Sequence, residues 1–282
     1  MILVHLSKYG CLILESQTNQ FIKMNKLKLS MLPLGILALS VTIYACNKDS
    51  TSSGSIVSVG NVSITSVVQS KFLSAVTIST SGSGSSSSIT LKSNGLPDHK
   101  TPYWGSGNAL YEPFPSGHAP NVNTDMTAQS YAMTIPTNPA EASSKEATSL
   151  GEIGMALNGV PLFNDREGGN VSLDAMTLTT FDYSGAHPAP RKNYHYHTTG
   201  RYTSVDDAKL IGFLRDGFPI YGRKDTTGVY PSLDSYGGHF GPTQDFQNGI
   251  YHYHASNVNY LNTGYYILKA GSYYGTKGTF TN

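Results

Sequence analysis

Three short motifs occur twice in this chain, in the same order, and this repetition constrains the fold more than any other feature. The first motif is an Ile-Gly pair that leads to an Asn-Gly or Asp-Gly turn and a proline, at 153–163 and 211–221. The second is Asp-x-x-Gly-x-His at 182–187 and 234–239, and the third is Tyr-His-Tyr-His at 194–197 and 251–254. Ordered recurrence of three motifs indicates an internal duplication, so we expect two similar halves related by a pseudo-two-fold axis.

The turn dipeptides predict a β-hairpin in each half. Asn-Gly and Asp-Gly between apolar runs favour a type I′ turn, in which both central residues have positive φ. The chain holds 19 tyrosines and 29 glycines, and only 13% of its residues are charged, a composition that favours strands and turns. We therefore predict a mainly β fold, an internally duplicated pseudo-two-fold β-sandwich or distorted barrel with long loops. Helix is expected only at 140–150 and 205–209.

The N-terminal part of the chain has the pattern of a targeting signal. A basic segment at 24–28 precedes an apolar run at 29–44, and Cys46 follows directly after an alanine. This order resembles a bacterial lipoprotein signal, in which the cysteine is lipidated and becomes the mature N-terminus. The alternative is a transmembrane helix, but the run is shorter than the roughly 20 residues that a bilayer requires. We expect a signal region at 1–45, with Met24 as an alternative start.

Lipidation of Cys46 would tether the protein to the bacterial cell envelope, at the outer membrane or the cell surface. Residues 46–89 are rich in Ser, Thr and Gly, which predicts a linker with one candidate strand at 57–68, and a folded domain at 90–282. If Cys11 is removed with the signal and Cys46 is lipidated, the mature protein has neither a disulfide nor a thiolate metal site. Its chemistry must then use histidine, carboxylate, tyrosine or backbone groups.

The histidines of the repeated motifs are the candidate metal ligands. Side chains alternate between the two faces of a strand, so both imidazoles of each Tyr-His-Tyr-His motif share one face, about 6.6 Å apart at the backbone. Each half adds a third histidine from its Asp-x-x-Gly-x-His motif. Three imidazoles are the ligand set of zinc and copper sites that keep one coordination position open. The predicted ligands are His187, His195, His197, His239, His252 and His254, in two sites or in one shared cluster.

The sequence evidence for a functional role is weaker for the other polar residues. Asp182 and Asp234 are expected to form turns or to orient His187 and His239 from the second coordination shell, with carboxylate ligation of the metal as the alternative. His99 and His118 have no counterpart in the duplication and are candidates for a lid or a ligand. The tyrosines of the two Tyr-His-Tyr-His motifs are expected to pack on the reverse face, with their hydroxyls reaching polar partners.

With its doubled Tyr-His-Tyr-His motif and the Asp-Gly-Phe-Pro-Ile-Tyr-Gly segment at 216–222 between the copies, the chain resembles the YHYH-domain family of secreted proteins. The resemblance covers roughly 95–275. It implies a shared fold and a shared histidine cluster, and it implies no particular reaction.

These observations favour an envelope-anchored protein that binds copper or zinc, with enzymatic activity left open. The alternative is a non-catalytic module that binds a glycan or another cell-surface polymer and has structural histidines. The net charge of +1 gives no electrostatic support for a nucleic-acid partner. The expected partners are therefore a metal ion, the membrane through the lipid on Cys46, and a small molecule or glycan.

Overall fold

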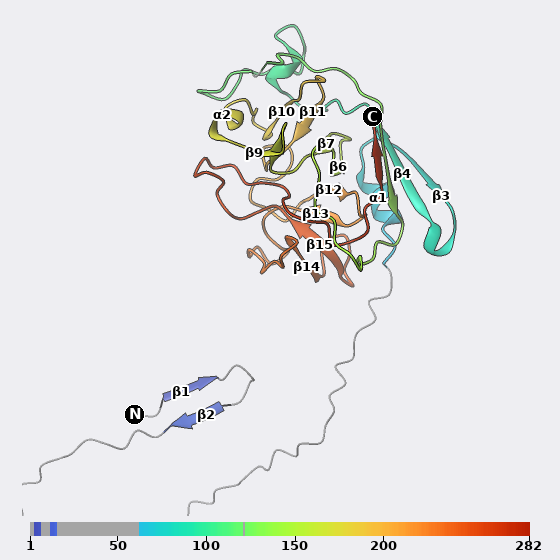
Figure 1. Cartoon of the computed structure of the whole chain (residues 1–282), viewed down its shortest axis with the longest axis vertical. Coiled ribbons are helices and arrows are strands. Elements are labelled where there is room, and N and C mark those ends of the chain that lie inside the picture. Colours follow the sequence, from blue (N-terminus) through green and yellow to red (C-terminus); the bar gives the residue numbers. More distant parts are fainter. Residues whose placement is uncertain (1–2, 7–11, 16–61, 121) are drawn as a thin grey trace, which may run out of the picture. The chain divides into compact units, whose positions relative to one another are not determined.

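The computed structural model describes residues 3–6, 12–15, 62–120 and 122–282 (Figure 1). The chain divides into two compact units, Met1–Gly54 and Ser55–Asn282. In the first unit, β1 (Leu3–Leu6) and β2 (Leu12–Glu15) form an antiparallel hairpin. The predicted basic segment, apolar run and Cys46 lie outside the described residues. Among the residues that are described, no helix has the length and apolar character needed to cross a bilayer.

The second unit is built on one eight-stranded sheet that contains both copies of the duplication. The strands follow one another in the order β10-β11-β7-β6-β12-β13-β15-β14, which Figure 1 shows running from the top of the unit to the bottom. The first four belong to the first copy and the last four to the second. Their bounds are β6 (Gly154–Ala156), β7 (Pro161–Leu162), β10 (Ala186–Pro188), β11 (Tyr194–Tyr196), β12 (Leu210–Leu214), β13 (Pro219–Tyr221), β14 (Gly238–Gly241) and β15 (Ile250–His254).

The pseudo-two-fold axis passes between β6 and β12. These strands are antiparallel, with Met155 opposite Phe213 and Gly154 opposite Leu214. Both Ile-Gly glycines lie at this junction, where the two backbones approach closely. A Cβ on Gly154 would lie 2.6 Å from the Phe213 carbonyl oxygen. Each half therefore contacts the other through its Ile-Gly pair, which accounts for the occurrence of this pair in both copies.

The predicted hairpins are present, but their turns are not type I′. In each turn only the glycine has positive φ, 86° at Gly159 and 85° at Gly217. The Gly159 N–H donates to the Ala156 carbonyl at 2.8 Å, which is the pattern of a type I turn followed by a left-handed glycine. The side chains of Asn158 and Asp216 are thereby left free to bind elsewhere in the molecule.

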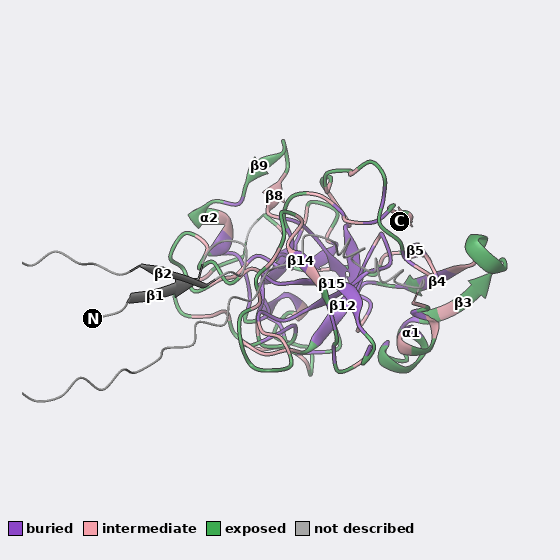
Figure 2. Cartoon of the chain, turned by 90° about the horizontal axis from the view of Figure 1, so that it is seen from below, coloured by how far each residue is buried: buried purple, intermediate pink, exposed green. Residues whose placement is uncertain are grey.

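A second, four-stranded sheet packs on the first, in the order β16-β5-β4-β3. Both sheets contribute to one core, in which Leu91 and Met133 lie in the same cluster as Met155 and Phe213. The arrangement is sandwich-like, and neither sheet closes into a barrel among the described residues. Figure 2 shows the central strand β12 buried and strand β3 largely exposed. The bounds are β3 (Thr77–Ser81), β4 (Ser88–Ser93), β5 (Tyr131–Pro136) and β16 (Thr279–Thr281).

The folded region begins before the predicted boundary at residue 90. Helix α1 (Thr65–Lys71) lies within the predicted linker, where a strand at 57–68 was expected, and β3 pairs with β4. Val68 and Phe72 are buried in the core cluster. The sequence analysis missed this segment because it is rich in Ser and Thr and contains few apolar residues. Those few residues nevertheless reach the core. The linker prediction is therefore wrong for the described residues 62–89.

The remaining elements are short. They are the 3₁₀ turns η1 (Gly84–Ser86) and η2 (Pro102–Trp104), the hairpin of β8 (Arg166–Glu167) and β9 (Val171–Ser172), and helix α2 (Ala175–Leu178). Neither helix predicted at 140–150 and 205–209 is present, although the fold is mainly β with little helix, as expected. Isolated bridges join Glu141 to Gly275 and Ala147 to Ser272 in the first of these segments, because its backbone lies along the C-terminal segment.

Candidate metal centres

The six predicted ligand histidines form two separate triads. In each triad, three imidazole nitrogens lie within 4.8 Å of one another. The first triad lies on β10 and β11 and the second on β14 and β15, at opposite ends of the eight-stranded sheet. Five strand spacings separate β11 from β15, on the order of 24 Å along the sheet. Of the two arrangements considered, the structure has two separate triads and no shared cluster among the described residues. Their members are His187, His195 and His197 in the first, and His239, His252 and His254 in the second.

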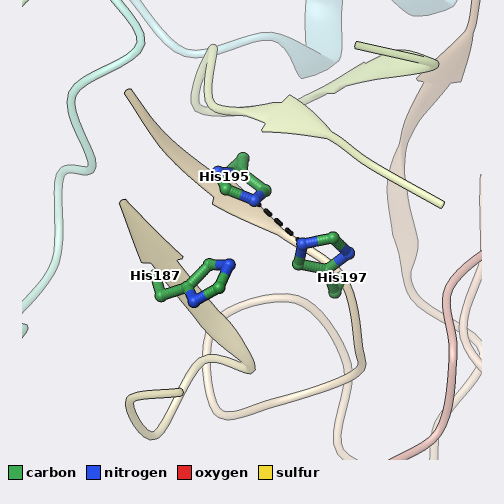
Figure 3. A group of neighbouring side chains, drawn as sticks. All are labelled: His187, His195 and His197. Carbon is green, nitrogen blue, oxygen red and sulfur yellow. Dashed lines mark hydrogen bonds between the residues drawn. The ribbon is translucent and has the colours of Figure 1, made fainter. Parts of the chain in front are cut away.

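Strand register brings each triad together. His187 lies directly opposite His195 in the antiparallel β10–β11 pair, and His239 lies opposite His252 in the β14–β15 pair. Directly paired residues point to the same face of the sheet. The third histidine follows two residues after the second, so alternation puts it on that face as well. Figure 3 shows the three rings of the first triad converging from their strands.

Backbone carbonyls fix the tautomers of His195 and His197. The Nδ1 atom of His195 is 3.0 Å from the Asn193 carbonyl oxygen, and that of His197 is 2.6 Å from the Asn164 carbonyl oxygen. A carbonyl oxygen only accepts hydrogen bonds, so each Nδ1 carries the proton and donates it. In the neutral ring, Nε2 is then left with a free lone pair.

Thr180 fixes the tautomer of His187 in the same way. Its hydroxyl donates to the Thr177 carbonyl at 2.6 Å and lies 2.7 Å from His187 Nδ1. Because the hydroxyl proton is already used, His187 must donate from Nδ1, and its Nε2 is also unprotonated when the ring is neutral. That Nε2 is buried and has no hydrogen-bond partner among the described residues.

The buried rings of His195 and His197 are held neutral. Burial, together with the neighbouring imidazoles, lowers the pKa of His195 well below its usual value. Burial, followed by the proximity of His187, lowers the pKa of His197 to about 4. Phe163 stacks near His195 and Phe181 near His197, with ring centroids 3.8 and 5.4 Å apart. These apolar rings exclude the water that would stabilise an imidazolium.

The lone pairs of two imidazole nitrogens therefore face each other in the first triad. The Nε2 atoms of His195 and His197 are 2.8 Å apart, the contact that is dashed in Figure 3. Two nitrogens can share a hydrogen bond only if one of them carries a proton, and the tautomers and low pKa values exclude this near neutral pH. The triad without a cation is therefore electrostatically unfavourable.

The second triad has a similar arrangement, but its short contact joins a different pair of rings. His252 Nδ1 is 2.9 Å from the Ile250 carbonyl oxygen, and His254 Nδ1 is 2.7 Å from that of Gly222. The Nε2 atoms of His239 and His254 are 3.1 Å apart. Burial is the main cause that lowers the pKa values of His252 and His254 to about 4. Unlike the buried first triad, the second is partly open, because His239 is half-exposed.

A carboxylate that the sequence analysis missed borders the first triad. Glu167 Oε1 on β8 is 3.3 Å from His187 Nε2 and 3.5 Å from His197 Nε2. Burial alone would raise the pKa of Glu167, but the interactions that it makes with His187 and His197 when those rings are protonated outweigh burial and lower the pKa. The repeat offered one signal for this residue. Glu167 follows Phe163 at the same interval at which Asp225 follows Tyr221, so both copies carry a carboxylate at this position.

Tyrosines on the reverse face link the three motifs of each half. Their hydroxyls meet side chains of the Asp-x-x-Gly-x-His motif or of the hairpin turn, as the sequence predicted in general terms. The pairs are Tyr194 with Asp182 (2.5 Å), Tyr251 with Asp234 (3.1 Å), Tyr196 with Asn158 (2.9 Å) and Tyr253 with Asp216 (2.6 Å).

Asp182 and Asp234 therefore face the tyrosines, and the structure records no hydrogen bond from either to His187 or His239. They also form the expected turns, since the Ser184 N–H donates to Asp182 and the Tyr236 N–H to Asp234, each at 2.8 Å. Asp216 of the second hairpin turn is fully buried against Tyr253.

His99 and His118 also lie apart from the triads. His99 Nε2 accepts the Tyr196 hydroxyl proton at 2.7 Å, and its ring stacks on Tyr202. His118 Nδ1 is 2.7 Å from the Phe181 carbonyl oxygen. His99 thus supports the reverse face of β11, and His118 supports the segment that carries an aromatic ring of the first triad.

The fold and the triads define an internally duplicated β-protein in which each half brings three imidazoles together. Residues 132–229 match the family model described as YHYH protein, which supports the assignment of this part of the chain to that family. The match is narrower than the expected 95–275; it includes the first triad and ends before the second. Neither the curated proteins nor the solved structures contain a significant match to this chain.

Proposed function

We propose that this protein binds one transition-metal ion in each histidine triad, through the Nε2 atoms. The observation that carries the proposal is the pair of unprotonated Nε2 atoms 2.8 Å apart in the first triad. In the second triad a short contact joins a different pair, the Nε2 atoms of His239 and His254, at 3.1 Å. Donors of one tetrahedral ion at 2.0–2.1 Å lie about 3.3 Å apart. A cation would need only a small separation of the rings and would neutralise their repulsion.

The donor set favours copper or zinc. Imidazole suits both ions, and a site without cysteine outside the cytoplasm suits Cu(II) in particular. The backbone carbonyls and Thr180 act on the opposite ring nitrogens, as outer partners of ligand histidines commonly do. Three protein ligands would leave a position for water or a substrate. We further propose that the lipid on Cys46 holds the protein in the cell envelope.

Elemental analysis of the purified full chain tests the proposal. After loading and dialysis, about two ions per chain are expected. The paired change His195→Ala and His197→Ala should remove one ion, and His252→Ala with His254→Ala the other. His99→Ala is the matched control, because it removes a buried histidine outside the triads.

Unchanged metal content in the variant that lacks all four of these histidines would contradict the proposal. Polysaccharide binding that persists after chelation, in a chain that takes up no metal, would instead support the alternative of a glycan-binding module. The full chain is required because α1 and β3 contribute to the core.

A further inference from the structure

The two triads differ in the carboxylate beside them. In the first, Glu167 Oε1 lies close to two of the three Nε2 atoms, at distances of 3.3 and 3.5 Å. These separations match the roughly 3.3 Å between donor atoms of one tetrahedral ion. Both Glu167 Oε1 and His187 Nε2 are buried without a hydrogen-bond partner among the described residues. When the His187 ring is neutral, two acceptors therefore face each other with no donor between them.

One short segment positions both Glu167 and His197. The Asn164 carbonyl accepts from His197 Nδ1, and the Asn164 side chain accepts from the Arg166 N–H at 3.0 Å. Glu167 follows on β8, which pairs with β9 through Arg166–Ser172 and Glu167–Val171. The segment that orients a triad imidazole thus also delivers the carboxylate.

The second triad has a different neighbour at the matching position. Asp225 Oδ1 accepts from the Thr227 N–H at 2.8 Å, the Thr227 hydroxyl at 2.6 Å and the Val229 N–H at 3.4 Å. Its side chain is one methylene shorter than that of Glu167 and is held within its own turn. No ion pair between Asp225 and a histidine of the second triad is recorded in the described part of the chain.

We propose that Glu167 is the fourth protein ligand of the first metal site, whereas the second site has three histidine ligands only. This inference rests on the proposed metal binding. The first ion is then enclosed by four protein donors and is structural in character. The second ion keeps a coordination position for an exogenous ligand, on the side where His239 is half-exposed.

Cobalt(II) is the probe for the test, because its visible spectrum reports coordination number and ligand exchange. The first site is isolated in the full chain by His252→Ala with His254→Ala, and the second by His195→Ala with His197→Ala. Azide is expected to change the cobalt spectrum of the isolated second site and to leave that of the isolated first site unchanged.

Glu167→Ala in the isolated first site should weaken cobalt binding at least tenfold, consistent with the loss of a ligand, and should make the spectrum sensitive to azide. Glu167→Gln keeps the side-chain size and should also weaken binding. Asp225→Ala in the isolated second site is the matched control and should change the affinity less than threefold, on the order of experimental scatter in such context-dependent effects.

Equal affinity and an unchanged spectrum in both Glu167 variants would overturn the role of Glu167 and leave metal binding by the triads intact. Failure of the isolated first site to bind cobalt with Glu167 present would instead contradict the proposed function itself. Thermal unfolding of each metal-free variant checks that it has folded.

Discussion

Histidine alternates with tyrosine in the repeated strands because the two faces of the sheet make different contacts. The imidazoles converge on one face, and each hydroxyl on the other reaches a residue of another motif. Tyr194 and Asp182 illustrate this, with both side chains fully buried and 2.5 Å between their oxygens. The repeated motifs are thus held in register by polar contacts as well as by the strand ladder.

Tyr194→Phe is expected to destabilise the fold by about 1–3 kcal/mol, because the buried Asp182 carboxylate loses a donor. Urea denaturation measures the change. Tyr183→Phe is the control, since Tyr183 is 38% exposed and its ring stacks with Arg201, a contact that phenylalanine retains. A loss in Tyr194→Phe no larger than in this control would contradict the structural role of the hydroxyl.

Lys269 gives the molecule a pH-dependent stability. It is 3% exposed, and burial lowers its pKa to about 8, with Asp216 opposing the shift. An unfolded lysine has a pKa of about 10.4, so between these values the unfolded chain binds more protons than the folded one, and stability rises with pH. Below pH 8 the folded chain carries the full cost of the buried charge.

The free energy of unfolding should therefore rise by on the order of 2–3 kcal/mol between pH 8 and pH 10.4, relative to Lys269→Met at the same pH. Denaturation across this range measures it. The comparison with Lys269→Met cancels the titration of the buried tyrosines. A difference that is constant with pH would show that Lys269 keeps its proton in the folded state.

At the scale of elements, matched positions in the two copies have different surroundings. The glycines of the Asp-x-x-Gly-x-His motifs both have positive φ, 69° at Gly185 and 78° at Gly237. A Cβ at Gly185 would clash with Thr198 and lie 2.9 Å from the Thr199 carbonyl oxygen, whereas one at Gly237 would meet no heavy atom within 4 Å among the described residues. Only the first turn is packed against its neighbours.

Gly237→Ala is expected to cost about 1–2 kcal/mol of stability, the strain of a left-handed alanine. Gly185→Ala should cost several kcal/mol, on the order of an overpacked core site added to that strain. Chemical denaturation of the two variants provides the comparison, with each glycine serving as the control for the other. Equal losses of stability in the two variants would contradict this expectation, because they would mean that the loop around residue 185 moves to accommodate the added methyl group.

The sequence predicted the features that depend only on the alternation of side chains along a strand. It predicted that His195 and His197 share a face, because alternation follows from strand geometry alone. It could not predict that Glu167 borders them, since this depends on the path of the β8–β9 hairpin. The segment around Val68 was also missed, because a few apolar residues in a Ser/Thr-rich stretch show their burial only when the core they reach is known.

At the scale of the whole molecule, the triads lie at the two ends of the eight-stranded sheet. Each joins an edge strand, β10 or β14, to its neighbour, and through Asn164 or Gly222 to a segment of the hairpin region. Metal bound in the folded state alone would therefore hold these outer strands in place. The duplication was foreseen, but the joining of both copies into one sheet was not, because strand order depends on long-range pairing.

Copper or zinc is expected to raise the free energy of unfolding by about 2.7 kcal/mol for each site at a free metal concentration of 100 times Kd. Thermal unfolding with and without metal measures the effect. The variant without His195, His197, His252 and His254 should show no such increase. An equal increase in that variant would place the responsible metal outside the triads.

The pairing of β6 with β12 also bears on how such a chain arose. Met155 and Phe213 occupy equivalent positions in the two copies and face each other across the pair, which is the register that two identical polypeptides adopt about a dyad. A half-length ancestor could have used this edge to associate with itself, each subunit contributing one ion-binding end. Tandem fusion of such a homodimer would then have allowed the two ends to diverge, a difference that Glu167 and Asp225 illustrate at matching positions.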